Sequence, residues 1–448
     1  MTLERILASS VLLVIAWLPL PVGSNRSWAI GLFVAAMGII LLLWGWLLLK
    51  DSSSRRWKTL KAGAVMVALL TSIQIWVAIQ LVFGITTNPG ATIEHLALGI
   101  AYLSLFILLL GLFRTRRRLT VLLSVLVITG VMQAFFGAFL VLADFEWAQA
   151  LQGRSRVVSG TFINRNHAAG YLAMMLSCGI GLLLALRDER AFRWHHVAGL
   201  LIGPKAWIRL SLIIMVIALV MTQSRMGNVA FFSSLLAIGM LFTALTPTNR
   251  LRNVLILASI LAIDTLIISQ WFGLEALQTR LADARFQNEV VEGNVVRREN
   301  IIRDNVLIYA IPQFKERPLL GYGAGTFETS FQRFPGSDVT RRWDHAHNDY
   351  LQIAIEFGLV GMVFFSVFTM LALWNGVKAI AMSKSRYRSG VGMGATMGVV
   401  ALLIHSIADF NLQIPANAAL FVTLCAVTVL AHTHRRNKKF TPQSIPKF

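Results

Sequence analysis

The chain has 448 residues, of which 56% are hydrophobic and 14% are charged, and its formal net charge is +20. Soluble globular proteins carry about 25% charged residues, so this composition excludes a water-soluble protein and predicts an integral membrane protein. The basic residues are dispersed over separate helix ends and do not form one folded basic surface, which argues against a nucleic-acid partner.

Apolar segments long enough to cross a bilayer, which takes about 20 residues, recur along the chain. They predict an all-α, polytopic membrane protein with about 12 transmembrane helices. The first and seventh segments are the weakest, because the first ends in Pro-Leu-Pro and the seventh is short. The predicted spans are 6–22, 28–49, 62–84, 96–113, 119–143, 161–186, 209–223, 227–246, 253–272, 350–373, 389–410 and 415–431.

The positions of Lys and Arg orient these spans, since basic residues are retained on the cytoplasmic side of short loops. Alternate loops, taken together with both termini, collect 26 basic residues against four acidic residues. We therefore expect both termini in the cytoplasm. The first span has the basic flank of a signal peptide but no small-residue cleavage site, and we expect it to be retained.

One hydrophilic segment, residues 273–346, lies between the ninth and tenth spans on the outer side of the membrane. Its ten basic and ten acidic residues cancel, which predicts a folded and partly helical loop subdomain. Residues 294–314 have helical periodicity, and Pro318 with the Gly-rich residues 321–325 ends that helix. The chain thus divides into spans 1–9 at 1–272, the loop at 273–346, and spans 10–12 with the cytoplasmic tail at 347–448. Asp264, within the ninth span, receives no role from the sequence.

Polar residues at membrane boundaries need a functional or structural reason, and here they gather on the outer side. They occupy four helix ends and the helix of the large loop. The set comprises Asn164, Asn166, His167, Gln223, Ser224, Arg225, Arg303, His347, Asn348, His405, Asp409, Asn411 and Gln413.

The residue types in this set predict a chemistry. An arginine presents a planar, permanently charged fork that suits phosphate oxygens, so Arg225 and Arg303 are candidates to hold a lipid-linked diphosphate. His347, expected on the first turn of a helix, should stay neutral because the helix dipole disfavours its protonated form. Singly, such residues are more often anchors or headgroup contacts. The spacing of His345 and His347 differs from the i to i+4 spacing of a zinc helix, and we expect no metal.

A longer pattern starts at the same histidine. His347 and Asn348 are followed by nine residues, then Gly358, two residues and Gly361. This run meets in full the signature His-[Asn/Ser/Gln]-x9-Gly-x2-[Gly/Thr/Tyr] of ligases in the bacterial O-antigen ligase and polymerase superfamily, which the chain therefore resembles.

Further segments resemble the same family of polytopic inner-membrane glycosyltransferases. Its pattern Arg-x3-Leu in the outer loop is met by Arg303 and Leu307, fifteen residues before Pro318. The opening of the sixth span at 160–167 and the Ser224-Arg225 pair are also similar. The resemblance covers roughly residues 155–415.

The resemblance implies an inverting, metal-independent glycosyltransferase without a cofactor. It would move a preassembled O-antigen glycan from undecaprenyl diphosphate to lipid A-core on the periplasmic side of the inner membrane. It also implies that His347 is the catalytic base and that Arg225 and Arg303 bind the diphosphate. The other substrate-binding candidates are Asn348, Asn166, His167 and His405.

Two kinds of alternative stay open. An O-antigen or exopolysaccharide polymerase, or a protein O-oligosaccharyltransferase, would use the same donor with another acceptor, and the complete ligase signature favours the ligase. A transporter or flippase would also suit twelve spans. Transporters tend to place polar and broken-helix elements at the bilayer midplane and to contain repeated halves, whereas these polar groups lie at one interface and the sequence has no repeated halves.

Overall fold

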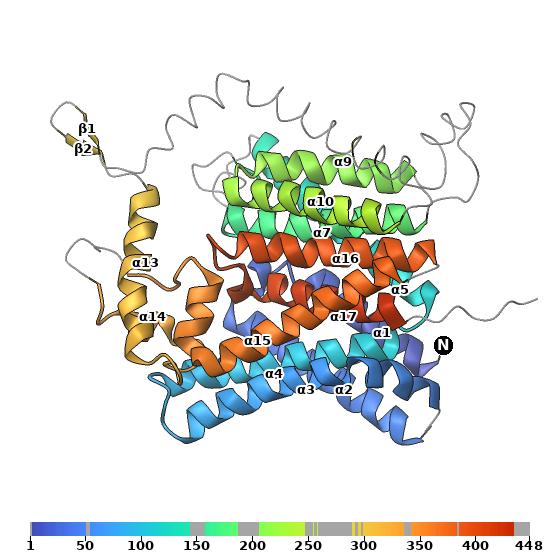
Figure 1. Cartoon of the computed structure of the whole chain (residues 1–448), viewed down its shortest axis with the longest axis horizontal. Helices are drawn as coiled ribbons and strands as arrows, with labels where there is room; N and C mark the ends of the chain where they lie inside the picture. Colours follow the sequence, from blue (N-terminus) through green and yellow to red (C-terminus); the bar gives the residue numbers. More distant parts are fainter. Residues whose placement is uncertain are drawn as a thin grey trace, which may run out of the picture.

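A computed structural model describes residues 2–50, 54–143, 157–186, 206–246, 289–291, 294–296, 299–335, 342–382 and 385–433, with residues 254 and 258. Apart from one short hairpin, the described chain is helical, and its long helices run side by side along one axis (Figure 1). The helices of this bundle are α1 (Leu3–Trp17), α2 (Ser27–Lys50), α3 (Ser54–Val82), α4 (Pro89–Leu112), α5 (Arg116–Leu142), α7 (Arg165–Ala185), α9 (Ala206–Met221), α10 (Arg225–Leu245), α15 (Asp349–Ala381), α16 (Arg386–His405) and α17 (Pro415–Thr433), with the 3-10 turns η1 (Val22–Ser24) and η4 (Asn411–Gln413).

Within the described residues, nine helices are long and apolar enough to cross a membrane. Two more of the predicted spans form shorter helices, since α1 has 15 residues and α9 has 16. The remaining span, 253–272, and Asp264 within it lie outside the described residues except for positions 254 and 258. The polytopic, all-α class is therefore confirmed, whereas the count of 12 is not.

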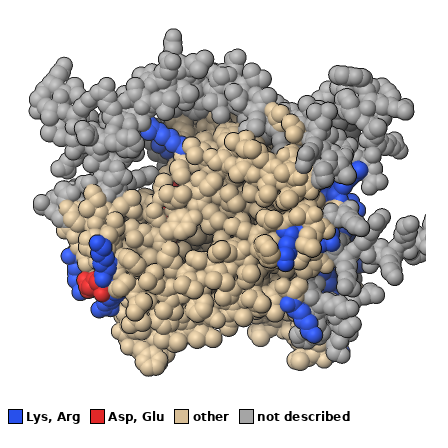
Figure 2. All heavy atoms as spheres, in the orientation of Figure 1, with Lys and Arg blue, Asp and Glu red and all other residues tan. Residues whose placement is uncertain are grey.

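The surface of the bundle has the distribution of charge that a lipid-facing protein needs. Large apolar side chains are exposed on its outer helices, as at Leu42 and Leu49 of α2. In Figure 2, Lys and Arg side chains lie toward the ends of the helices, and uncharged residues form the broad face between them. Apolar middles and charged ends are expected of helices that span a bilayer.

The centre of the bundle is α7, which is buried along its length and packs most extensively against α16. Two glycines bring these helices together. A Cβ on Gly181 would lie 2.6 Å from the Cα of Gly394, and the reverse substitution would bring an equally short contact. Small residues at such crossings let helix backbones approach closely within membranes. The pair lies near the end of α7, and because the two helices are antiparallel the start of α7 lies beside the end of α16, where Gly170 approaches His405.

Between α10 and α15 the structure describes a short hairpin and two helices, and the two helices form a small subdomain at one end of the bundle (Figure 1). Strands β1 (Glu289–Val291) and β2 (Asn294–Val296) pair antiparallel, with Glu289 opposite Val296. They are followed by α13 (Glu299–Glu316) and α14 (Phe327–Phe331). The prediction that the helix begins at residue 294 was therefore wrong, because the β-branched valines there favour a strand.

A separate hydrophobic cluster joins this subdomain to α15. It combines residues of α13, the Gly-rich loop, α14 and α15 itself, so its packing continues past residue 346 onto the membrane helix. Its buried members are Val306, Ala310, Tyr322, Phe327, Phe331, Ala346 and Ile355.

Helix α15 is broken at Gly358, which has φ +65° and ψ −177°. The amides beyond the break bond to the chain before the Gly-rich loop, with Leu359 N–H donating to Pro318 O at 2.8 Å. A Cβ on Gly358 would lie 2.1 Å from Leu319 O. The first glycine of the signature thus marks the point where the loop docks into a broken membrane helix.

The opposite end of the bundle holds the two ends of the described chain. Glu4 at the start of α1 pairs with Arg114 at 3.1 Å and with Arg118 at 2.6 Å. Arg388 at the start of α16 donates to Ala431 O near the end of α17 at 2.7 Å. Both ends therefore lie away from the α13–α14 subdomain (Figure 1). Their assignment to the cytoplasm stays a prediction.

Candidate active site

The signature histidine lies just before α15. The helix begins at Asp349, and Asn348 is its N-cap, with the Asn348 side chain accepting the Leu351 N–H at 3.0 Å. His347 precedes the cap at φ +53°, a left-handed conformation that is uncommon outside glycine. The prediction that His347 occupies the first helical turn was therefore wrong. Asparagine is among the strongest N-cap residues, and as the N-cap Asn348 sets the helix start at Asp349, two residues after His347.

Hydrogen bonds fasten this helix start to the end of α16. Asn348 Nδ2 donates to Ile407 O at 2.9 Å, and Asp349 N donates to Ser406 O at 3.0 Å. The buried Asp349 carboxyl group accepts from Ser406 Oγ at 2.7 Å and from Leu412 N at 3.1 Å. The turn that carries His347 is consequently held against the loop after α16.

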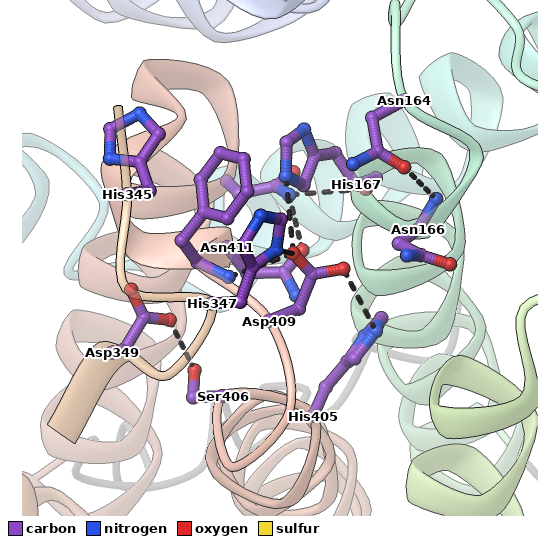
Figure 3. A network of polar contacts seen from close by, with 12 residues as sticks. Asn164, Asn166, His167, His345, His347, Asp349, His405, Ser406, Asp409 and Asn411 are labelled. Carbon is purple, nitrogen blue, oxygen red and sulfur yellow. Dashed lines mark hydrogen bonds and ion pairs between the residues drawn. The ribbon is translucent and has the colours of Figure 1, made fainter. Parts of the chain in front are cut away.

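Asp409, in that loop, is surrounded by three imidazoles (Figure 3). Its Oδ1 lies 3.5 Å from His167 Nε2 and 4.0 Å from His347 Nδ1, and its Oδ2 lies 4.0 Å from His405 Nε2. Burial alone would raise the pKa of this carboxyl, but His167, His405 and the Phe410 N–H lower the pKa of Asp409 below its usual range. Asp409 is thus a buried, ionised carboxylate shared by histidines from α7, α16 and the turn before α15.

The phenyl ring of Phe410 packs against three imidazoles, two of which also face Asp409. His345 stacks on it with centroids 4.2 Å apart, whereas His347 and His167 meet it edge-on at 4.8 Å and 4.5 Å. Trp343 contacts the other side of the site, with its ring centroid 5.2 Å from that of His347. His347 is therefore held between aromatic rings, and its side chain is 13% exposed.

His405 is buried between α7 and α10. A Cβ on Gly170 of α7 would lie 3.2 Å from His405 Nδ1, and one on Gly227 of α10 would lie 3.3 Å from His405 Cε1. Asn417 of α17 closes the same region by donating to Asn411 Oδ1 at 2.9 Å and to His167 O at 3.1 Å. The helices bring the imidazoles together because glycines leave room for them.

The remaining predicted residues lie around this centre. Asn166 is half-buried in the first turn of α7, where its N–H donates to Asn164 Oδ1 at 2.9 Å. Arg225 is exposed on the first turn of α10, two residues before the glycine that contacts His405. Arg303 belongs to α13, and its side chain lies outside the described residues.

Sequence reasoning gave no role to the residues that organise this site. Asp409 was noted as polar, and its i, i+4 spacing from His405 was the available signal for a partnership. No signal in the sequence pointed to Phe410, because an apolar residue beside a membrane helix is ordinary. Within the described part of the chain, these side chains do not form a group with the arrangement of metal ligands.

Comparison with known proteins finds one family. Residues 210–366, about a third of the chain, match the family model described as O-antigen ligase. No curated protein sequence matches the chain. The matched region runs from α9 into α15 and includes Arg225, Arg303 and His347. His167 and Asp409, which complete the centre, lie outside it.

Proposed function

We propose that this multi-pass membrane protein, which belongs to the O-antigen ligase and polymerase superfamily, is an O-antigen ligase. In this proposal it transfers a preassembled glycan from undecaprenyl diphosphate to a hydroxyl of lipid A-core. The observation that carries the proposal is the contact between His347 and the buried carboxylate of Asp409 at the mouth of the bundle.

His347 has the arrangement of a general base with an orienting acid. Its Nδ1 faces Asp409 Oδ1 at 4.0 Å. In the proposed mechanism Nε2, the other ring nitrogen, receives a proton from the acceptor hydroxyl. The hydroxyl oxygen then attacks the anomeric carbon from the face opposite the diphosphate, and the configuration inverts. The bond from that carbon to the diphosphate oxygen breaks, and the leaving group takes the electron pair. The proton stays on His347, where the carboxylate stabilises the imidazolium.

Arginines are proposed to bind the leaving group. Arg225 lies at the N-terminus of α10, where the helix dipole also favours an anion, and its side chain is exposed. Arg303 is proposed as the second cation, contributed by α13. Fixed positive charge near the diphosphate stabilises the transition state, in which negative charge grows on the leaving oxygen. The diphosphate ester already carries the activation, so the proposed reaction uses no nucleotide, metal or other cofactor.

We further propose that the active site faces the periplasm of the bacterial inner membrane. The basic clusters of the short loops support this orientation, because the pairs formed by Arg114, Arg118 and Arg388 lie at the end opposite the site. Cysteines introduced singly beside Trp343 and beside Arg388 would test it. A membrane-impermeant maleimide applied to intact spheroplasts should label the first position only.

The identity of the acceptor is the decisive measurement. Purified protein would be supplied with an undecaprenyl-diphosphate glycan and with lipid A-core, a second lipid-linked glycan or a pilin-like protein. The ligase predicts transfer to lipid A-core. Transfer only to the second glycan would make the protein a polymerase, and transfer only to the protein would make it a protein O-oligosaccharyltransferase.

A further inference from the structure

His345 is connected to the Gly-rich loop by a chain of buried hydrogen bonds. Gln352 Nε2 lies 3.1 Å from His345 Nδ1 and 3.0 Å from Glu356 Oε1. Glu356 in turn accepts the N–H groups of Gly325 at 3.0 Å and Phe327 at 3.3 Å. Gln352 and Glu356 are each 1% exposed.

The groups around Gln352 fix the orientation of its amide. The backbone N–H of Ala346 can only donate, and it bonds to Gln352 Oε1 at 3.1 Å. On the other side of the amide, Glu356 Oε1 faces Gln352 Nε2 at 3.0 Å and accepts. The NH₂ group of Gln352 therefore donates to both Glu356 and His345.

The orientation of the amide decides the tautomer of His345. A donor at Gln352 Nε2 requires Nδ1 of the imidazole to accept, so the neutral ring carries its hydrogen on Nε2. Burial agrees with a neutral ring, since it lowers the pKa of His345 to about 4. Among the described residues, none accepts a hydrogen bond from His345 Nε2.

We infer that His345 is a substrate-binding residue, whose Nε2–H donates a hydrogen bond to a sugar oxygen of the glycan beside His347. The inference rests on the proposed function and adds a second imidazole to the site. Phe410 fixes the two rings relative to each other, because both pack on it, at 4.2 Å and 4.8 Å. Gln352 and Glu356 are positioning residues, which act by keeping the hydrogen of His345 on Nε2.

The tautomer is measurable directly. Nitrogen NMR of ¹⁵N-histidine-labelled protein, assigned by comparison with His345→Gln, should show a protonated Nε2 and an unprotonated Nδ1. The double variant Gln352→Glu/Glu356→Gln keeps the net charge and the amide–carboxylate pair. It presents a carboxylate to Nδ1, so the hydrogen should move to Nδ1. A wild-type ring protonated on Nδ1 would overturn the inference.

Kinetics separate a substrate contact from a role in folding. His345→Asn places an amide near Nδ1 and loses the outer donor, whereas His345→Gln places an NH₂ group near Nε2. We expect kcat/KM to fall roughly tenfold in His345→Asn and in the double variant, as for one lost hydrogen bond, with His345→Gln closer to wild type. The substrate whose KM rises, lipid-linked donor or acceptor, is the one that His345 contacts.

The outcomes distinguish this inference from the proposed function. If the double variant moves the hydrogen but leaves kcat/KM unchanged for both substrates, His345 is not a substrate contact. If wild-type protein transfers glycan to none of the three acceptors, the proposed function fails. The affinities of the same variants for an undecaprenyl-diphosphate glycan and for each acceptor glycan then decide the role of His345, and equal affinities for all of them would overturn it.

Discussion

Replacing Asp409 by asparagine tests the centre of the proposed mechanism with little change in shape. The substitution keeps the size of the side chain and one oxygen, and it removes the negative charge that faces three imidazoles. In the proposed reaction His347 becomes an imidazolium as the acceptor loses its proton. The variant should therefore lose stabilisation that exists mainly in the transition state.

The distance between the Asp409 carboxylate and the His347 imidazole sets the size of the expected fall in kcat. At 4.0 Å and an effective dielectric constant of about 20, two opposite charges attract by about 4 kcal/mol. Each 1.36 kcal/mol corresponds to about tenfold in rate, so kcat should fall by about 10³-fold in Asp409→Asn. The acidic limb of the pH–rate profile should also move to lower pH, because protonated His347 loses its counter-ion.

The assay is glycan transfer to lipid A-core at saturating donor, with the amount of folded protein measured by size-exclusion chromatography. Glu4→Gln provides a matched control, since it also removes a carboxylate paired with basic groups, at the opposite end of the bundle. Its kcat should stay close to wild type. A folded Asp409→Asn protein with wild-type kcat would refute the carboxylate–imidazole mechanism.

Four further predictions concern single residues. His347→Ala should lower kcat by 10²-fold to 10⁴-fold as a general base is lost, and wild-type turnover in inserted protein would contradict its role. Arg303→Lys should raise the KM for the donor at least several-fold, because it keeps the charge but loses the fork; an unchanged KM would argue against diphosphate binding. Gly358→Ala should destabilise the protein by about 1–3 kcal/mol or more, because the backbone conformation at this position is almost restricted to glycine and the added Cβ would meet Leu319 O. An unchanged melting temperature in detergent would contradict this prediction. The pKa of His345 is about 4 when folded and about 6.5 when unfolded, so the unfolded chain binds its proton first and stability falls as pH drops from 6.5 to 4. The melting temperature of His345→Phe should fall less than that of wild type over this window, and parallel curves would exclude the effect.

The sequence predicts the membrane helices well because their signal is local. A run such as that of α10 has no stable alternative to a helix within a bilayer, where every backbone polar group must be satisfied. Helix starts are less predictable. Several neighbouring polar residues could cap α15, and the observed N-cap is Asn348, whose side chain accepts the Leu351 N–H of the same helix.

The candidate site is only partly predictable, because its central contacts join residues that are far apart in the chain. Composition and topology gathered His167, His347 and His405 on one side of the membrane. They did not indicate that a single carboxylate, Asp409, lies among them. The partners of Gln352 are local in the chain, but its role depends on the turn before α15, which brings the Ala346 N–H and His345 against it and which the sequence did not predict.

The sharing of Asp409 among three helix ends has a consequence for biogenesis. His167 is synthesised with the sixth predicted span, His347 before the tenth, and the carboxylate only after the eleventh. A nascent chain that stops before α16 can already insert most of its membrane helices. It lacks Asp409, and it lacks the loop after α16 that holds the turn before α15 in place. Under the proposed mechanism, competence for the reaction is therefore gained late, when the last two helices join the bundle, because a partly inserted chain lacks the carboxylate that orients His347.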